Sequence, residues 1–229
     1  MVLPWVAHLY TALGAVLAFA AALCLVDGDF QSAFLALLLA TLIDTTDGWL
    51  ARTLHVQEHL PHFDGARLDD IVDYLTFVFV PMLLVWRAGL LPAGWGVPVG
   101  GVVLLASAYG FGQVDAKVRT TDHFFTGFPS YWNIVALYLV LLGLAPAWNA
   151  GVVLGLAVLV FVPIGYLYPS RMTSWRTPTL VFGSAWAALI VWIVWRLPEV
   201  SPVAVLWSLA FPAYYVVLSL VLHARRVAP

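Results

Sequence analysis

The sequence predicts an all-α, polytopic integral membrane protein with about eight transmembrane helices. The first observation is composition: 63% of the 229 residues are hydrophobic, only 10% are charged, and the mean hydropathy is +0.96. Soluble domains carry about 25% charged residues, so most of this surface is expected to face lipid. The second observation is a series of apolar runs, each of about 20 residues, which is the length of a helix that crosses a bilayer.

Eight such runs follow one another along the chain, joined by short linkers. In order, they occupy residues 5–26, 32–52, 68–86, 96–114, 129–146, 149–168, 178–196 and 202–222. The first run is expected to be a mature helix, because no Lys or Arg precedes it and it is longer than the 7–15 apolar residues of a signal peptide. No repeat or soluble appendage interrupts the series, so residues 1–229 are expected to form one domain.

The basic residues predict the orientation of these helices. Only Arg87 and Arg196 fall in linkers on one side of the membrane. Alternate linkers place the other basic residues on the opposite side: Arg52, Arg67, Lys117, Arg119, Arg171, Arg176, Arg225 and Arg226. Because Lys and Arg accumulate in cytoplasmic loops, we expect both termini and these linkers on the cytoplasmic side.

Four aspartates stand out on the second and third predicted helices. Asp44 and Asp47 are three residues apart, and Asp69 and Asp73 are four apart, so each pair shares one helix face. The linker between the helices contains Pro61, where a helix break is expected. A charge near the bilayer centre costs roughly 2.5–3.5 kcal/mol on insertion scales. Two antiparallel helices would bring the two acid pairs face to face, and something must stabilise them there.

A divalent cation is the counter-charge that such a cluster predicts. Neighbouring carboxylates raise one another's pKa, so four of them need positive charge nearby to stay ionised. Oxygen ligands suit magnesium, manganese or calcium, and no Cys/His cluster predicts zinc. Two alternatives stay open: salt bridges to Arg52 or Arg67, and an ion-coupled transporter that uses the acids as a relay.

Small residues accompany the acids on the same helix faces. Gly48 and Ala51 lie on the face of the first acid pair, and Gly65 lies on that of the second. They would let a ligand approach the backbone closely, although small residues also serve helix packing in membranes. Room for a ligand beside paired metals favours phosphoryl-type transfer.

The eight positions together resemble the signature of the CDP-alcohol phosphotransferases: Asp44-x-x-Asp47-Gly48-x-x-Ala51-Arg52, then Gly65-x-x-x-Asp69-x-x-x-Asp73. Enzymes of this family cleave the diphosphate of a CDP-linked alcohol, release CMP and pass the phosphoalcohol to a second alcohol. The resemblance implies that the four aspartates hold two divalent ions, Mn²⁺ or Mg²⁺. It also implies that Asp73 is the general base. Gly48, Ala51 and Gly65 would line the cytidine pocket, and Arg52 would hold the nucleotide end.

The linker inside the signature is longer than usual. Twelve residues, Thr53 to Asp64, separate Arg52 from Gly65, and the additional four amount to about one helical turn. This spacing, with "LPHFDGARLDDIVDY" and "DHFFTGFPSYWN", resembles the bacterial phosphatidylcholine synthases. That resemblance implies that CDP-diacylglycerol and choline give phosphatidylcholine and CMP. It also implies a bacterial inner membrane, contact with membrane lipids, a possible homodimer and no nucleic acid partner. Within the family, glycerol phosphate, inositol phosphate or serine stays open as another acceptor.

Choline carries a quaternary ammonium group, which aromatic faces bind through cation–π contacts. The candidate side chains for this group are Asp70, Tyr74, Phe124, Tyr131, Trp132 and Asn133. Aromatic residues also form belts at membrane interfaces whatever the function, so that alternative stays open. The phosphates of a lipid substrate would need cations, for which the candidates are Lys117, Arg119, Arg171 and Arg176. Control of topology is the alternative role of these basic residues.

Overall fold

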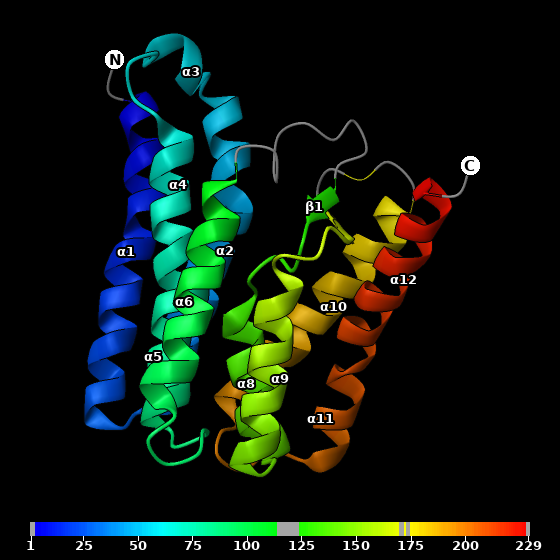
Figure 1. Cartoon of the computed structure of the whole chain (residues 1–229). Coiled ribbons are helices and arrows are strands. Elements are labelled where there is room, and N and C mark those ends of the chain that lie inside the picture. Colours follow the sequence, from blue (N-terminus) through cyan, green and yellow to red (C-terminus); the bar gives the residue numbers. More distant parts are fainter. Residues whose placement is uncertain (1–2, 114–123, 170–171, 173–174, 228–229) are drawn as a thin grey trace.

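The protein is described by a computed structural model that covers residues 3–113, 124–169, 172 and 175–227. Helices run up and down a single bundle, and a small sheet lies at one end (Figure 1). In chain order, the elements are α1 (Leu3–Asp27), α2 (Phe30–Thr53), α3 (Val56–His59), α4 (Gly65–Asp73), the π-helix η1 (Tyr74–Phe79), α5 (Val80–Arg87), α6 (Gly96–Gly112), β1 (Phe124–Thr126), α8 (Trp132–Leu142), α9 (Pro146–Leu159), β2 (Gly165–Leu167), α10 (Arg176–Trp195), α11 (Pro202–Ser208) and α12 (Ala210–Val227).

The predicted fold class, an all-α membrane protein, is confirmed. Among the described residues, four helical stretches are long and apolar enough to cross a membrane: α1, α2, α10 and residues 202–226. The third predicted run is α4, η1 and α5, which follow one another without a break over residues 65–87. Three further apolar helices, α6, α8 and α9, have only 17, 11 and 14 residues. The described helices therefore vary in length more than the eight predicted spans of about 20 residues.

One predicted run needs a correction. The run at 149–168 is expected to be one helix, but α9 ends at Leu159 and residues 165–167 form strand β2. Val162 to Ile164 turn the chain between them, and Pro163 lies in that turn, where it cannot continue a helix. Hydropathy alone does not distinguish this buried strand from a membrane helix, because the same apolar residues serve both.

The start of α1 and the end of α12 lie at the same end of the bundle, together with α3 and the sheet (Figure 1). The opposite end holds the turn between α1 and α2. There Gly28 takes a positive φ of 77°, and the Asp29 side chain accepts a hydrogen bond from the Ser32 backbone N–H at 3.0 Å. This capping satisfies a free N–H of α2. Hydrogen bonds from the Ser32 side chain and backbone lower the pKa of Asp29. The turn fixes α1 against α2 and thereby aligns the polar residues that the two helices share.

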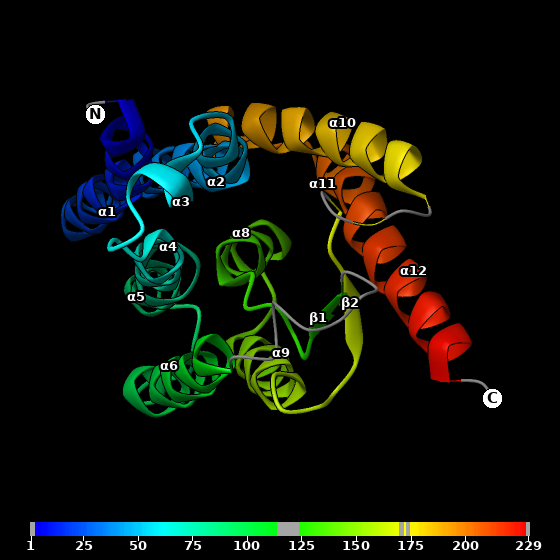
Figure 2. The same ribbon diagram turned by 90° about the horizontal axis from the view of Figure 1, so that it is seen from above.

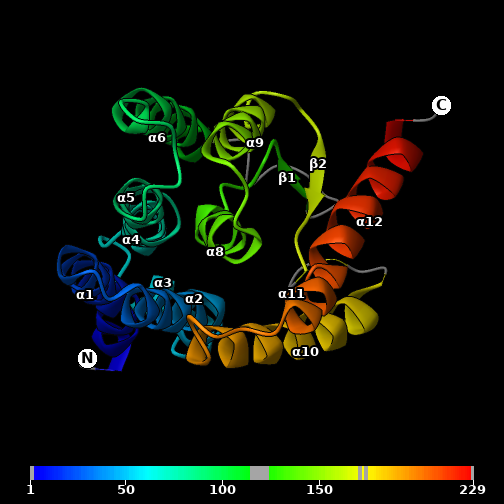
Figure 3. The same cartoon turned by 90° about the horizontal axis from the view of Figure 1, so that it is seen from below.

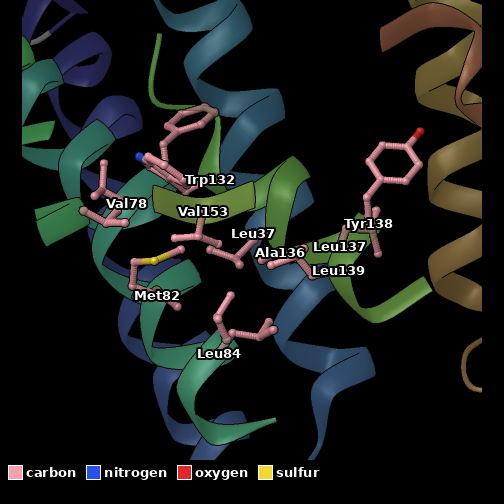
Figure 4. Packing of buried hydrophobic residues seen from close by; sticks show 14 of the residues in the cluster. Leu37, Val78, Met82, Leu84, Trp132, Ala136, Leu137, Tyr138, Leu139 and Val153 are labelled. Carbon is pink, nitrogen blue, oxygen red and sulfur yellow. The ribbon is translucent and has the colours of Figure 1, made fainter. Parts of the chain in front are cut away.

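Helix α8 lies at the centre of the bundle, surrounded by α2, α5, α9 and the sheet (Figures 2 and 3). Its Trp132 is fully buried and donates a hydrogen bond from Nε1 to Ser107 Oγ at 2.8 Å. Figure 4 shows Trp132 in a cluster with Val78, Met82 and Val153, side chains from three other segments. A helix that is apolar all round is buried by its neighbours, which explains why so short a helix is stable here.

The sheet is completed by side chains rather than by a third strand. Strands β1 and β2 pair antiparallel, and the free edge of β2 faces α12. Gly165 N–H donates to His223 Nδ1 at 3.2 Å, and Leu167 N–H donates to Ser219 Oγ at 3.1 Å. The Tyr215 hydroxyl donates to the Leu167 carbonyl at 3.0 Å. Three residues of α12, each four apart, therefore satisfy the buried backbone of β2.

Helices α1 and α4 approach closely at Gly14. A Cβ atom at position 14 would lie 2.5 Å from Val72 Cγ1, much nearer than two carbon atoms can pack. Val is branched and has little rotamer freedom in a helix, so it cannot move aside. The contact holds α1 beside the stretch of α4 that carries Asp69 and Asp73.

We predict that Gly14→Ala destabilises the protein by about 1–3 kcal/mol, the usual cost of overpacking. The measurement is the thermal unfolding midpoint of the purified protein in detergent. Gly100→Ala in α6 is the matched control, because no atom lies within 4 Å of a Cβ there. That control should be neutral or slightly stabilising, since Ala favours a helix over Gly by about 1 kcal/mol. Equal midpoints for the two variants would contradict the close approach of α1 and α4.

Candidate metal centre

Three predicted acids come together between α2 and α4. Asp44, Asp47 and Asp69 each place one carboxylate oxygen within 4.8 Å of the others. Asp73, one turn beyond Asp69, lines the same small space. It lies directly before η1, and π-helical stretches often occur at functional sites. The structure therefore brings Asp44, Asp47 and Asp69 together, with Asp73 lining the same space.

Helix α1 adds a residue that sequence reasoning missed. Thr11 donates a hydrogen bond from Oγ1 to Asp47 Oδ2 at 2.7 Å, and Asp47 is only 7% exposed. One residue earlier, the hydroxyls of Tyr10 and Thr46 are 2.8 Å apart. Polar residues in an otherwise apolar first helix were the available signal. Thr11 fixes the orientation of Asp47, so three helices rather than two build the centre.

This donor set fits a divalent cation. Ligand oxygens around one hard cation lie about 2.0–2.6 Å from it, so any two of them are at most about 5 Å apart. The oxygens of Asp44, Asp47 and Asp69 meet that condition. The ligand set contains oxygen only, which suits Mg²⁺ or Mn²⁺ better than zinc. The alternative salt bridge from Arg67 has another partner in the structure, because Arg67 Nε lies 3.7 Å from Asp64 Oδ2.

A cavity of about 920 Å³ opens from the acids toward α3. Asp47 and Asp69 line it, and so do the four residues expected to bind a nucleotide: Gly48, Ala51, Arg52 and Gly65. A Cβ atom at Gly48 would lie 3.2 Å from Arg52 Nη1, so the guanidinium group lies over this glycine. Ligand sites of drug-like size occupy about 300–1,000 Å³, so the cavity can hold a nucleotide.

The long linker covers this cavity. The four additional residues correspond to one turn of helix, α3, which begins after His55 in the left-handed conformation. Val56 of α3 is buried, and the residues that follow it line the cavity. His55 Nδ1 lies 3.5 Å from Glu58 Oε1 within the same turn. The longer spacing therefore leaves the acids in place and builds a wall above them.

Tyr131 is the predicted choline residue that lies beside the acids. Its ring contacts those of Phe77 and Tyr215, with centroids 6.3 and 6.2 Å away. Asp44 and Asp73 lie near enough to its hydroxyl to interact with it electrostatically. That hydroxyl is hydrogen-bonded to Tyr215, whose own hydroxyl donates to the Leu167 carbonyl. Tyr131 therefore joins the metal centre to the sheet.

Three other candidates for choline use their polar groups in contacts between helices. Trp132 is fully buried and bonded to Ser107. Asn133 is 4% exposed, donates from Nδ2 to Thr41 Oγ1 at 3.0 Å and accepts from the Ile134 N–H. Tyr74 donates its hydroxyl to the Leu104 carbonyl of α6 at 2.8 Å. Because these polar groups are used between helices, the structure gives these residues a role in packing.

The remaining candidates are less close to the acids or are not described. Phe124 lies in β1, where its ring packs 3.4 Å from a Cβ position at Gly165. Asp70 is half-buried on the flank of α4. Arg176 is exposed and begins α10. Lys117, Arg119 and Arg171 lie outside the described residues, so their predicted contacts with phosphate stay predictions.

The family model and the similar proteins all point to one family. Residues 4–214 match the family model described as CDP-alcohol phosphatidyltransferase. The chain is 39% identical over 222 residues to a phosphatidylcholine synthase of Pseudomonas aeruginosa, covering 97% of this chain and 92% of the relative. It is 31% identical over 216 residues to that of Rhizobium meliloti, covering 94% and 89%. It is 40% identical over 169 residues to that of Legionella pneumophila, covering 73% and 66%.

We predict that Thr11→Val weakens divalent metal binding about tenfold or more, as is usual when a residue that orients a ligand is lost. The change keeps the shape of the side chain and removes the hydrogen bond that Thr11 donates to the buried Asp47. Titration of the metal-free protein with Mn²⁺ in a calorimeter measures the affinity. Thr53→Val is the control, since this exposed hydroxyl bonds only its own helix, at Trp49. Unchanged Mn²⁺ affinity in Thr11→Val would show that α1 does not support the centre.

Proposed function

The chain belongs to the CDP-alcohol phosphatidyltransferase family, and from this membership we propose that it synthesises phosphatidylcholine. The reaction transfers the phosphatidyl group of CDP-diacylglycerol to choline and releases CMP. The observation that carries the proposal is the acid cluster at the floor of a nucleotide-sized cavity whose walls are the other signature residues. The relatives named phosphatidylcholine synthase support choline as the acceptor.

The cavity and the acids suggest how the donor binds. The cytidine end would occupy the cavity, with Gly48, Ala51 and Gly65 beside it and Arg52 over it. The diphosphate would then lie at the floor, next to Asp47 and Asp69. The acyl chains would remain in lipid, because the outer faces of the surrounding helices are apolar and exposed. Binding in this way excludes water from the diphosphate except through the cavity.

The four aspartates are proposed to hold two divalent ions, Mn²⁺ or Mg²⁺. When bound, such ions neutralise the diphosphate and stabilise the charge on the departing CMP. Asp44, Asp47 and Asp69 supply the closest oxygens, and Thr11 keeps Asp47 aimed at the centre. Asp73, at the far end of the acid stripe, has the position to act on the acceptor rather than on the nucleotide.

The proposed transfer is a single displacement at phosphorus. The carboxylate of Asp73 accepts the proton of the choline hydroxyl. The choline oxygen forms a bond to the phosphorus that carries diacylglycerol. The bond from that phosphorus to the bridging oxygen of the diphosphate breaks, and its electron pair leaves with CMP. The products are phosphatidylcholine, CMP and one proton.

The surroundings of Tyr131 suit a quaternary ammonium group. Phe77 follows Asp73 by one turn, and the rings of Tyr131, Tyr215 and Tyr166 continue from it at centroid spacings of 6.2–6.5 Å. Each aromatic face gives a cation about 0.5–2 kcal/mol. Phosphorylated acceptors would need Arg or Lys instead, whereas the neighbours of Tyr131 among the described residues include Asp44, Asp73 and aromatic rings. This environment favours choline over glycerol phosphate or inositol phosphate.

We also propose which membrane holds the protein and which way it faces. The chain is an integral membrane protein, by its helices and its family. The bacterial inner membrane, with the acids and both termini toward the cytoplasm, follows from the excess of basic residues in the linkers on that side. Choline and released CMP would then exchange with the cytoplasm. A homodimer stays a prediction.

The reaction itself is tested with purified protein in detergent, CDP-diacylglycerol, Mn²⁺ or Mg²⁺, and each alcohol in turn. We expect choline-dependent formation of phosphatidylcholine and CMP, and loss of both when a chelator removes the metal. Asp73→Asn should lower the rate at least about a hundredfold, as loss of a general base does. Asp27→Asn is the control and should keep full activity, because Asp27 is the last residue of α1 and lies away from the acids. Reaction with another alcohol and none with choline would overturn the acceptor assignment.

We further predict that Tyr131→Leu raises the KM for choline about 2- to 30-fold, the equivalent of one cation–π contact. The KM for CDP-diacylglycerol should not change. Tyr109→Leu is the control, because Tyr109 is exposed on α6 and packs against Phe161. A rise in both KM values would assign Tyr131 a structural role, and no rise at all would remove it from the acceptor site.

A further inference from the structure

One helical turn above the acids, three helices present a second layer of residues to the cavity. His8 precedes Thr11 by three residues on α1, Ala51 follows Asp47 by four on α2, and Gly65 precedes Asp69 by four on α4. Each step is about one turn, or roughly 5 Å along the helix. All three residues line the cavity. A ligand whose diphosphate lies at the acids therefore places its next group against this layer.

His8 is the polar side chain of this layer. It is 8% exposed, and its Nε2 has no hydrogen-bond partner among the described residues. A Cβ atom at Gly65 would lie 2.7 Å from His8 Cε1 and 3.2 Å from Nδ1. Gly65 was expected to make room for a ligand. The structure shows that the room beside this glycine is occupied by the imidazole ring, so position 65 is small in order to admit His8.

Two aromatic rings complete the surroundings of His8. The Phe63 ring lies 4.3 Å from the His8 ring, centroid to centroid, and 5.3 Å from that of Trp5. Phe63 is 39% exposed and lines the cavity. It belongs to the linker that is four residues longer than usual, so the linker places a flat apolar face beside an imidazole nitrogen. Flat rings beside one hydrogen-bonding group suit a nucleobase better than a ribose, which needs several polar partners.

Packing alone does not explain a histidine at this position. A buried nitrogen without a partner costs stability, and an apolar side chain of the same shape would avoid that cost. The cost is offset when a bound ligand supplies the missing hydrogen bond. Because His8 lines the cavity that the donor substrate would fill, the ligand that can do so is the nucleotide.

We propose that His8 hydrogen-bonds the cytosine base of the CDP group, with Phe63 covering the base, and that this contact selects cytidine nucleotides over uridine nucleotides. The inference rests on the proposed function and identifies the part of the enzyme that reads the base. Cytosine and uracil differ at the ring edge, where cytosine has an amino group and an unprotonated ring nitrogen. An imidazole held in one tautomer distinguishes them, because its Nε2 then either accepts only, as from the cytosine amino group, or donates only, as to the cytosine ring nitrogen.

The test measures binding of CMP and UMP to the purified full-length protein with Mn²⁺ present, by calorimetry or by the rise in unfolding temperature. We expect the wild type to prefer CMP. His8→Phe keeps a ring of similar size. It should weaken the binding of CMP at least about tenfold and leave the binding of UMP unchanged. Phe63→Leu should weaken the binding of both nucleotides by the same factor. His59→Phe is the control, because His59 is exposed and its Nδ1 bonds the His55 carbonyl of its own turn.

The outcomes separate this inference from the proposed function. The unfolding temperature of His8→Phe without nucleotide shows that the variant is folded, and it should not fall, since an unpartnered nitrogen has been removed. Equal weakening of CMP and UMP, or no weakening of either, would overturn the role of His8. Phosphatidylcholine formation by the wild type is followed in parallel. Its absence would count against the proposed function, whichever nucleotide the protein prefers.

Discussion

Carboxylates held within 4.8 Å of one another inside an apolar bundle are the constraint on which the rest of this structure depends. Their mutual repulsion must be offset, because like charges in a medium of low dielectric constant cannot all remain ionised. Three helices supply the geometry: α2 and α4 carry the acids, and α1 packs against α4 at Gly14 and against α2 at Thr11. Divalent cations supply the charge, and a diphosphate is a ligand that such cations hold well.

The two ends of the acid stripe have different neighbours, and this difference divides the site between two substrates. Toward α3, small residues, Arg52 and the His8–Phe63 pair surround a nucleotide-sized cavity. Toward η1, Asp73 adjoins Phe77 and Tyr131, whose hydroxyl leads through Tyr215 to the backbone of β2. The small sheet thus fixes α12 and Tyr215 at the aromatic end of the site.

Much of the centre could be predicted from the sequence because it depends on local helical geometry. The spacings of Asp44 with Asp47 and of Asp69 with Asp73 determine which face they share, and the four extra linker residues form one turn of helix. What depends on contacts between helices could not be read in this way. The bond from Thr11 to Asp47, the imidazole beside Gly65, and the use of Trp132 and Tyr74 in packing follow from tertiary structure. Nor could hydropathy separate β2 from a membrane span, since apolar residues serve burial by protein and by lipid equally.

The central claim is that the four aspartates share a pair of divalent ions, and the position of those ions tests it most directly. Crystals of the protein grown with Mn²⁺ and CMP would give anomalous scattering at the manganese absorption edge. We expect two peaks about 3.5–4 Å apart, bound by Asp44, Asp47, Asp69 and Asp73 beside the cavity. Manganese bound elsewhere, or a CMP phosphate away from these carboxylates, would contradict it.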